Sequence, residues 1–406
     1  MEYTESYFKL SKAFSSDQQS IEVEDKIIQK FSFHSVSHDI LPGLDIHHCK
    51  EHNLDFNESY SFSNSIGAFG DIIHVKDTLV DENKDFTYFI IRPAGSKTVN
   101  RVTFMLHGFN EKNWDKYFSW GNALCDRTQG AVVFFPLAFH MQRAPLEWSD
   151  KREMFLLSEL RKKLFPDVVD SSLINVASSV RLHYMPQRFI WSGLQSYYDI
   201  IQLIEDCKQG KHSLIDRDFT FNIFAYSIGG LVAEVLRLSN YRNYFSDTKV
   251  CLFCSGSVFN RMSPVSKYIL DSEATVAMYS YLTEHLDHFF KKDSLLQHYM
   301  NGDHLEGKVF YSMLRYNRMR EFRENLFRKA ADSFYAIPLH KDAVIPSNEV
   351  VDTLKGAYRD IDIRVEEMDF NFPYSHESPF PINKSDSKLV DFSFSNVFDK
   401  AGAFLK

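Results

Sequence analysis

The chain has 406 residues, of which 44% are hydrophobic and 25% are charged, and its net charge is −8. This composition is that of an ordinary globular protein, and the length allows two or three domains, or one large domain with insertions. Acidic and basic residues are interspersed and no long basic run occurs, so we do not expect nucleic acid as a partner.

Neither the first residues of the chain nor its apolar runs indicate export or membrane insertion. The first residues, MEYTESYFKL, lack a basic region followed by an apolar stretch, so we expect no signal peptide. No apolar run approaches the roughly 18 residues that a membrane-spanning helix needs. The five cysteines are odd in number and scattered, which is typical of reduced thiols, and we expect a cytoplasmic location.

Residues 1–70 are polar and only weakly periodic, and we interpret them as an N-terminal extension packed on the main body. The segment HHCKEH, His47–His52, contains metal-ligating residue types. It has no second ligand pair at a usual zinc spacing. We therefore interpret it as a surface loop and expect no metal site.

From residue 71 onward, strand patterns alternate with helix patterns. The expected strands are 71–80, 85–95, 101–108, 131–139, 218–227, 249–257, 333–340 and 361–369, and the clearest helices are 121–130, 192–210 and 228–241. Such alternation argues for βαβ units and a mostly parallel sheet. Residues 141–190 are mixed in pattern, whereas residues 257–330 are strongly helical and are interpreted as an inserted helical cap.

The cysteine pair Cys251 and Cys254 has the spacing of a redox motif. It lies in the apolar stretch KVCLFCSGS, which reads as a strand. Redox C-x-x-C motifs open a helix, so this setting favours buried packing.

The stretch FAYSIGG, Phe224–Gly230, has the context of a nucleophile elbow. A buried strand precedes Ser227 and a helix pattern follows at once, as such an elbow requires. The turn brings the residues two before and two after the serine close together, and here both are small, Ala225 and Gly229. The helix start directs free N–H groups at the site, so the N–H of Ile228 is a candidate oxyanion donor.

With this elbow, the chain resembles the α/β-hydrolase superfamily over roughly residues 85–256 and 330–400. The resemblance implies that a second oxyanion donor follows an earlier strand that ends in His-Gly. Here that pair is His107-Gly108 in MLHGFNE, with the N–H of Phe109 as the expected donor and Asn110 as the alternative. A simple strand-end turn is the other interpretation of this pair.

The superfamily order of nucleophile, acid and histidine directs the search for partners of Ser227. The turn after strand 333–340 carries Asp342, and no histidine other than His376 follows it. Histidine takes the serine proton and a carboxylate holds its tautomer, so these residue types suit the chemistry. Asp332 and Glu377 are weaker candidates for the acid, because the first precedes the strand and the second is adjacent to the histidine.

Substrate-contacting residues are expected near strand ends, where α/β enzymes gather their sites. The candidates are Asn110, His140, Arg143 and Trp148. The aromatic residues of segment 257–330 are expected mainly to form a small helical core, with some facing a cleft. His285 and His288 lie three apart on one helix but have no evident third ligand, so a solvated face is expected.

The sequence therefore predicts an α/β-hydrolase core over 71–256 and 331–406, with a helical cap over 257–330. The expected activity is serine hydrolysis of an ester or related acyl bond of a small, partly apolar substrate, without a cofactor. The alternatives are an acyltransferase, an amide, thioester or carbon–carbon bond hydrolase on the same triad, or a binding protein on this fold. A binding protein would usually have lost the serine or the histidine, and both are present.

Overall fold

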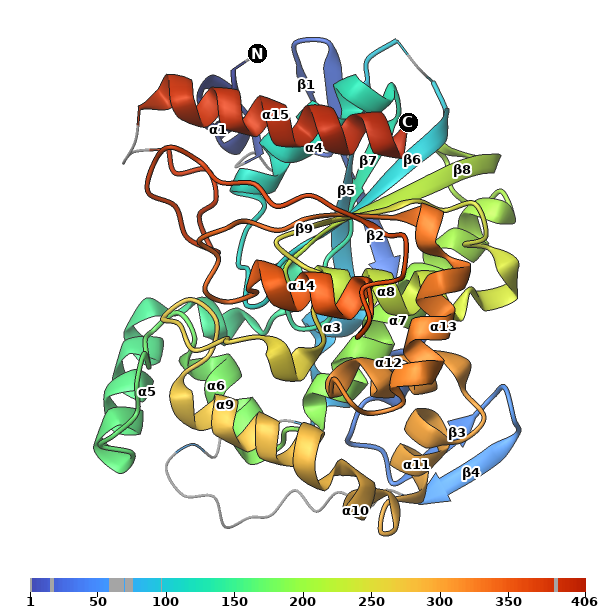
Figure 1. Ribbon diagram of the computed structural model, residues 1–406, viewed down its shortest axis with the longest axis vertical. Coiled ribbons are helices and arrows are strands. Elements are labelled where there is room, and N and C mark those ends of the chain that lie inside the picture. Colours follow the sequence, from blue (N-terminus) through green and yellow to red (C-terminus); the bar gives the residue numbers. More distant parts are fainter. Residues whose placement is uncertain (1, 15–17, 58–68, 70–75, 96, 383–385) are drawn as a thin grey trace.

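The computed structural model describes residues 2–14, 18–57, 69, 76–95, 97–382 and 386–406 (Figure 1). Its centre is a nine-stranded sheet with the order β1-β2-β5-β7-β6-β8-β9-β10-β11. These strands are Ser20–Val23 (β1), Lys26–His34 (β2), Asp85–Pro93 (β5), Val99–Leu106 (β6), Ala131–Phe134 (β7), Ile215–Tyr226 (β8), Val250–Phe253 (β9), Phe334–Ile337 (β10) and Arg364–Val365 (β11). A separate hairpin joins β3 (Ile46–Cys49) to β4 (Leu54–Asn57).

The sheet is mostly parallel. Strands β7, β6, β8, β9, β10 and β11 run parallel to one another, whereas β1, β2 and β5 join antiparallel. All residues of β7, β9 and β10 are buried, as expected for strands covered by helices on both faces. This topology confirms the predicted α/β-hydrolase fold.

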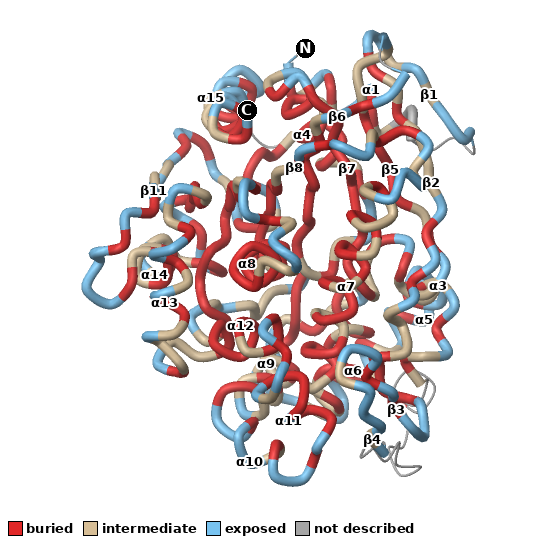
Figure 2. Tube along the Cα trace, turned by 90° about the vertical axis from the view of Figure 1, so that its right-hand side faces the viewer, coloured by how far each residue is buried: buried red, intermediate tan, exposed pale blue. Residues whose placement is uncertain are grey.

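Helices cover both faces of the sheet. The described helices are Tyr3–Phe14 (α1), Asp81–Lys84 (α3), Asp115–Thr128 (α4), Lys151–Leu164 (α5), Val176–Tyr184 (α6), Arg188–Lys208 (α7), Gly229–Ser239 (α8), Ser272–Tyr279 (α9), Leu286–Phe290 (α10), Ser294–Asn301 (α11), Leu305–Leu314 (α12), Arg320–Lys329 (α13), Ser347–Leu354 (α14) and Ser387–Leu405 (α15). Helices α1, α4 and α15 share one apolar core, and α7 and α8 belong to the other. Helix α8 is buried along its whole length, at the centre of Figure 2. None of the described helices combines the length and apolarity that crossing a membrane requires.

The N-terminal segment differs from the sequence-based expectation. Residues 20–34 were expected to belong to an extension, but β1 and β2 are strands of the central sheet. β2 pairs with β5 over nine residues, from Lys26 with Pro93 to His34 with Asp85. The short sequence pattern of β2 is compatible with either a helix or a strand. Pairing along the edge of β5 gives this segment its strand conformation.

Other element boundaries also differ. Of the expected strand 71–80, residues 71–75 lie outside the described residues, and Asp77–Leu79 form a 3-10 turn. The last expected strand, 361–369, is reduced to Arg364–Val365. The helix expected to begin near Ser192 begins at Arg188.

Segment 257–330 is helical, as the pattern predicted, and contains α9 to α13. Helix α12 packs against α8, next to the centre of the sheet. His285 and His288 are exposed, as expected. The division at residues 256 and 330 into a core and a cap stays a prediction. The five cysteines are buried free thiols, which agrees with the packing role expected for Cys251 and Cys254.

Candidate active site

The site lies where β6 and β8 end. These strands are neighbours in the sheet, and the chain leaves them toward opposite sides. Such a switch point at the carboxyl ends of parallel strands is where open α/β sheets bind ligands. His107 follows β6 and Ser227 follows β8, so the two predicted loops meet there.

Ser227 occupies a strained turn between β8 and α8. Its φ of 55° lies in the left-handed region, which non-glycine residues seldom adopt. Its N–H donates to the carbonyl of Phe253 at 3.3 Å, and its carbonyl accepts from the Ser255 hydroxyl at 2.6 Å. These contacts hold the turn in place. They anchor its backbone to β9 and to the residues that follow that strand.

The glycine two residues after the serine is required by close packing. A Cβ at Gly229 would lie 2.7 Å from the carbonyl oxygen of His107 and 2.8 Å from that of Leu106. The elbow and the loop after β6 are therefore pressed together through their backbones. Any side chain here would force them apart.

The structure brings together the three residues predicted to act as nucleophile, base and acid. The hydroxyl of Ser227 lies 2.7 Å from Nε2 of His376. Nδ1 of the same ring lies 2.7 Å from Oδ2 of Asp342. All three side chains are buried, with exposed fractions of 3–5%. A carboxylate on Nδ1 leaves Nε2 as the nitrogen that accepts the serine proton.

Asp342 is itself held in a fixed orientation. Its Oδ1 accepts the N–H groups of Val344 and Ile345, both at 2.9 Å. This leaves Oδ2 for the imidazole. The two weaker candidates are placed elsewhere, since Asp332 lies in a 3-10 turn before β10 and the Glu377 carboxylate accepts from the Ser266 hydroxyl.

Tyr226 supports the loop that carries the histidine. Its ring stacks on that of His376, with centroids 5.4 Å apart and planes 19° from parallel. Its hydroxyl donates to the backbone carbonyl of His376. Burial raises the pKa of Tyr226 well above its usual value, so the hydroxyl keeps its proton and remains a donor. The residue next to the serine thus positions the histidine that is predicted to act as the base.

The two predicted oxyanion donors are the backbone N–H groups of Ile228, next to Ser227 in the chain, and of Phe109, in the loop after β6. Within the described part of the chain, neither Phe109 nor Ile228 donates its N–H to another group. Ile228 is the N-cap of α8, where the helix directs partial positive charge. Both residues line the same cavity. The alternative donor, Asn110, has φ of 57° and uses its side-chain amide on the carbonyls of Ile174 and Tyr268.

His107 braces the loop that carries Phe109. Its Nε2 accepts the N–H of Leu137 at 2.9 Å, so Nδ1 carries the proton and donates to the carbonyl of Gly108 at 2.8 Å. Burial lowers the pKa of His107 well below its usual value, and the ring stays neutral. The histidine of the His-Gly pair therefore has a structural contact, linking the ends of β6 and β7.

Phe109 and Ile228 both line an apolar cavity. Its walls come from the loops after β6 and β7 and from α7, α8 and α12. Besides Phe109 and Ile228, the main contributors are Leu137, Phe189, Gly193, Leu231, Val232, Val235 and Phe310. The part of the wall that α8 contributes could have been found in the sequence. Apolar residues stand three, four and seven positions after Ile228, the N-cap of α8, and this spacing places them on one face of the helix. The residues that α7 and α12 contribute to the wall show no comparable pattern in the sequence around them.

The four predicted substrate contacts divide into two groups. His140 lines this cavity, and Trp148 lines an adjacent one that also contains His140. Asn110 and Arg143 are in neither lining. Arg143 is fully buried and pairs with Asp199 at 2.6 Å, and Asn83 accepts from it, so its contacts are structural.

His140 places a ring nitrogen without a hydrogen-bond partner among the described residues in the cavity wall. Its Nδ1 lies 2.8 Å from the carbonyl of Ala138, and its Nε2 has no hydrogen-bond partner in the described residues. Burial lowers the pKa of His140 to about 4. A neutral ring that donates through Nδ1 presents the lone pair of Nε2 as an acceptor.

The adjacent cavity has a charged wall. Asp77 pairs with both Arg181 and Arg188, and all three line this second space. The cluster carries one more positive than negative charge. The two cavities share Phe109, His140 and Phe189, among others, so they are neighbouring parts of one hollow region.

A family model described as "Family of unknown function (DUF6051)" matches residues 1–406. No curated protein matches the sequence. Similar solved structures include carboxyl esterase 2 from the mycorrhizal fungus Tuber melanosporum, with 12% identity, a TM-score of 0.43 and coverage of 80% of this chain and 82% of that one.

The chain is also similar to two further solved structures. A thermostable esterase from Pseudomonas putida ECU1011 has 10% identity, a TM-score of 0.43 and coverage of 100% and 91%. The acylaminoacyl peptidase of Pyrococcus horikoshii has 12% identity, a TM-score of 0.40 and coverage of 79% and 40%. With identities this low and TM-scores below 0.5, these likenesses say nothing about the reaction or the substrate of this chain.

Proposed function

We propose that this chain, which belongs to the DUF6051 family, is a serine hydrolase that cleaves an ester or related acyl bond of a small, partly apolar substrate. One observation carries the proposal. A serine with left-handed backbone, at the start of a buried helix, contacts a histidine that in turn contacts a buried carboxylate, with both side-chain distances 2.7 Å. A structural role alone requires neither the strained turn nor this chain of contacts.

In the proposed reaction, Ser227 Oγ attacks the substrate carbonyl carbon while Nε2 of His376 takes the hydroxyl proton. The resulting oxyanion is stabilised by the N–H groups of Phe109 and Ile228. His376 then gives its proton to the leaving alkoxide, and the acyl group remains bound to Ser227. A water molecule, deprotonated by the same nitrogen, attacks the acyl carbon. The bond to Ser227 Oγ then breaks, His376 returns the proton to Oγ, and the acid is released.

Asp342 acts on the histidine in this scheme. Its Oδ2 holds Nδ1–H and stabilises the imidazolium that forms in each half-reaction. Because Oδ1 is fixed by two backbone N–H groups, the carboxylate loses little freedom when the reaction begins. The scheme requires no metal ion or organic cofactor.

The apolar cavity supports an acyl chain or ring as the part of the substrate next to the carbonyl. It adjoins both proposed oxyanion donors and is lined mainly by Leu, Val, Ile and Phe. In this arrangement His140 accepts a hydrogen bond from a polar substituent, and Trp148 contacts a group that extends into the adjacent cavity.

The decisive experiment is hydrolysis of p-nitrophenyl esters of graded acyl length by the wild-type protein and Ser227→Ala. We expect the variant to lose at least about 10³-fold in kcat, because no other group replaces the nucleophile. Ser158→Ala is a matched control, since Ser158 is also buried but lies on α5. Equal activity of wild type and Ser227→Ala would overturn the proposal.

Labelling by a fluorophosphonate probe addresses the case in which none of these esters is a substrate. We expect wild-type protein to be labelled on Ser227 and Ser227→Ala to remain unlabelled. Absence of labelling in the folded wild type would instead favour a binding protein. Acyl transfer to an added alcohol or thiol that exceeds hydrolysis would favour a transferase.

A further inference from the structure

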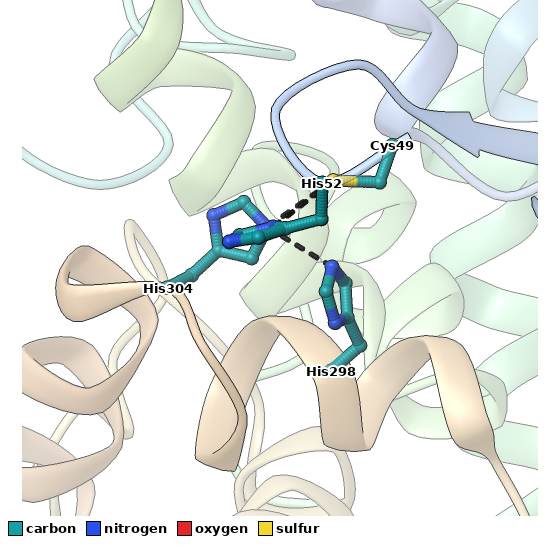
Figure 3. Close-up of side chains that lie close together, drawn as sticks. All are labelled: Cys49, His52, His298 and His304. Atoms are coloured by element: carbon teal, nitrogen blue, oxygen red, sulfur yellow. Dashed lines mark hydrogen bonds between the residues drawn. The ribbon is translucent and has the colours of Figure 1, made fainter. Parts of the chain in front are cut away.

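Four metal-ligating side chains that belong to neither the proposed triad nor the apolar cavity meet in the structure (Figure 3). Cys49 ends β3 and His52 lies in the following turn, whereas His298 lies on α11 and His304 is the N-cap of α12. The segment HHCKEH was expected to be a surface loop without partner ligands. The structure differs in two respects: Ile46–Cys49 form strand β3 with Cys49 buried, and candidate partner side chains come from residues about 250 positions later in the chain.

Three of the six separations among the four ligand atoms match those around a tetrahedral ion. Zn–N bonds of about 2.0–2.1 Å and a Zn–S bond of about 2.3 Å separate two nitrogens by about 3.3 Å and sulfur from nitrogen by about 3.6 Å. Nε2 of His298 lies 3.2 Å from Nε2 of His304. Sγ of Cys49 lies 3.4 Å from Nε2 of His304 and 3.6 Å from Nδ1 of His52. All four atoms lie within 4.8 Å of one another.

The orientation of the rings supports the same conclusion. The rings of His52, His298 and His304 are mutually perpendicular, with interplanar angles of 87–88° and centroids 4.7–5.0 Å apart. Figure 3 shows them converging with the Cys49 sulfur on one point. Rings that packed only through their faces would have no reason to direct one nitrogen each to a common centre.

The contacts of His304 direct its inward nitrogen, Nε2, toward the other proposed ligands. Its outward Nδ1 lies 2.9 Å from a carboxylate oxygen of Glu306, and that carboxylate also accepts from the hydroxyl of Tyr198. With Nδ1 donating, a neutral ring presents the lone pair of Nε2 to both Cys49 and His298. Metal-bound histidines usually donate their other N–H to a carboxylate in this way.

We propose that Cys49, His52, His298 and His304 bind one zinc ion through Sγ, Nδ1, Nε2 and Nε2. A thiolate with three imidazoles is a ligand set that suits Zn²⁺. Binding releases the thiol proton of Cys49 to solvent. Four protein ligands leave no open position, so the ion is structural and takes no part in hydrolysis.

The ion would join two segments that are distant in sequence. The β3–β4 hairpin, at the edge of the molecule in Figure 1, would be fastened to α11 and α12. Helix α12 packs against α8 and carries Phe310 into the apolar cavity. Zinc would therefore stabilise the helical segment behind the cavity. This inference stands independently of the proposed hydrolase activity.

The test is the metal content of the full-length protein after loading with zinc and removal of excess, measured by elemental analysis. We expect about one zinc ion per chain in the wild type, as in other sites with four protein ligands. Cys49→Ser and His298→Gln should each lose most of the bound metal, whereas His288→Gln, at an exposed position of the same segment, should keep it. Wild-type protein that retains no zinc would overturn the proposal, as would unchanged binding in Cys49→Ser.

Two further measurements test the zinc site even if the ligand variants fail to fold. Wild-type protein stripped of zinc and loaded with Co²⁺ should show the absorption bands of tetrahedral cobalt and a sulfur-to-metal charge-transfer band. Bands of octahedral cobalt without the charge-transfer band would contradict the assignment. Glu306→Gln, which keeps the side chain's shape, should weaken zinc affinity about 10- to 100-fold, and unchanged affinity would contradict the role given to its carboxylate.

Discussion

At the scale of the residue, the backbone of Ser227 has an unfavourable conformation that hydrogen bonds from neighbouring residues hold in place. The left-handed φ of a serine costs of order 1–3 kcal/mol and persists only where the surroundings impose it. Here Phe253 and Ser255 hold the turn from the next strand. The hydroxyl is thereby placed where His376 reaches it, and this geometry supports a nucleophilic role.

Asp342→Asn tests the tautomer assigned to the histidine. The retained Oδ1 still accepts from Val344 and Ile345, so the loop should keep its shape. The amide NH₂ would face Nδ1 and favour the tautomer with its proton on Nε2, which cannot accept the serine proton. We expect kcat for p-nitrophenyl ester hydrolysis to fall about 10⁴-fold with an unchanged unfolding temperature. A loss below tenfold would remove Asp342 from the proposed triad.

Gly229→Ala tests the contact between the elbow and the loop after β6. The added methyl would lie 2.7 Å from the His107 carbonyl oxygen, and backbone atoms there have little room to move. We expect a loss of about 1–3 kcal/mol in the free energy of unfolding, measured by denaturant titration, together with reduced activity. Gly95→Ala is the control, because a Cβ there meets nothing within 4 Å. Equal stability of the two variants would show that the contact relaxes without cost.

At the scale of the element, α8 links the proposed chemistry to the proposed pocket. Its N-cap, Ile228, is one of the proposed oxyanion donors, and the same helical face carries Leu231, Val232 and Val235 into the cavity wall. In the proposed reaction, one helix therefore sets the distance between the reacting carbonyl and the apolar part of the substrate. The position of α12 then limits how far that part extends, since Phe310 forms a wall.

Val232→Phe should shorten the acyl chain that the cavity accepts. Each methylene excluded from an apolar site costs about 0.8 kcal/mol, or about a fourfold loss in kcat/KM. We expect hydrolysis of acetyl esters to change little and that of longer esters to fall progressively, in a series of p-nitrophenyl esters. Val276→Phe, at an exposed valine of α9, is the control. A uniform loss across the series would place the acyl chain elsewhere.

At the scale of the whole molecule, the sheet is built from segments that the chain supplies far apart. The N-terminal β2 pairs with β5, and the proposed acid and base follow β10 and β11 near the other end. The hairpin β3–β4 meets α11 and α12 through the proposed metal ligands. Contacts of this range make the proposed active-site geometry dependent on nearly the full chain.

The pH dependence of stability should reflect histidines that are buried in neutral form. Burial lowers the pKa of His140 to about 4 and holds that of His107 well below its ordinary value. An unfolded histidine has a pKa of about 6.5, so below that pH the unfolded state binds more protons than the folded state. The free energy of unfolding should therefore fall with decreasing pH, by up to about 1.4 kcal/mol per pH unit for each such histidine.

Urea titrations between about pH 7 and pH 5 measure this slope. His140→Gln removes one neutral histidine and should make the decline shallower than in the wild type. His288→Gln, at an exposed position, should leave the slope unchanged. If His140→Gln and the wild type lose stability at the same rate, His140 is not held neutral in the folded state.

The sequence alone was sufficient for the features that depend on local pattern and chain order. The elbow around Ser227 shows itself through a strand, small residues and a helix in immediate succession, and the order of motifs then leads to Asp342 and His376. The alternation of strand and helix patterns predicted the α/β fold. The elbow and the strand and helix patterns are local signals, because each depends on residues within one element and its adjacent turn. Asp342 and His376 were instead assigned through the order that the resemblance to α/β-hydrolases implies.

The tertiary structure decided what depends on contacts between distant segments. The cavity wall from α7 and α12, the place of β2 in the sheet and the meeting of Cys49 and His52 with His298 and His304 all belong to this class. Residues some 250 positions apart share no periodicity and no spacing rule. Whether such residues meet depends on how the helices pack on the sheet. Their contacts can therefore be recognised only in the folded structure.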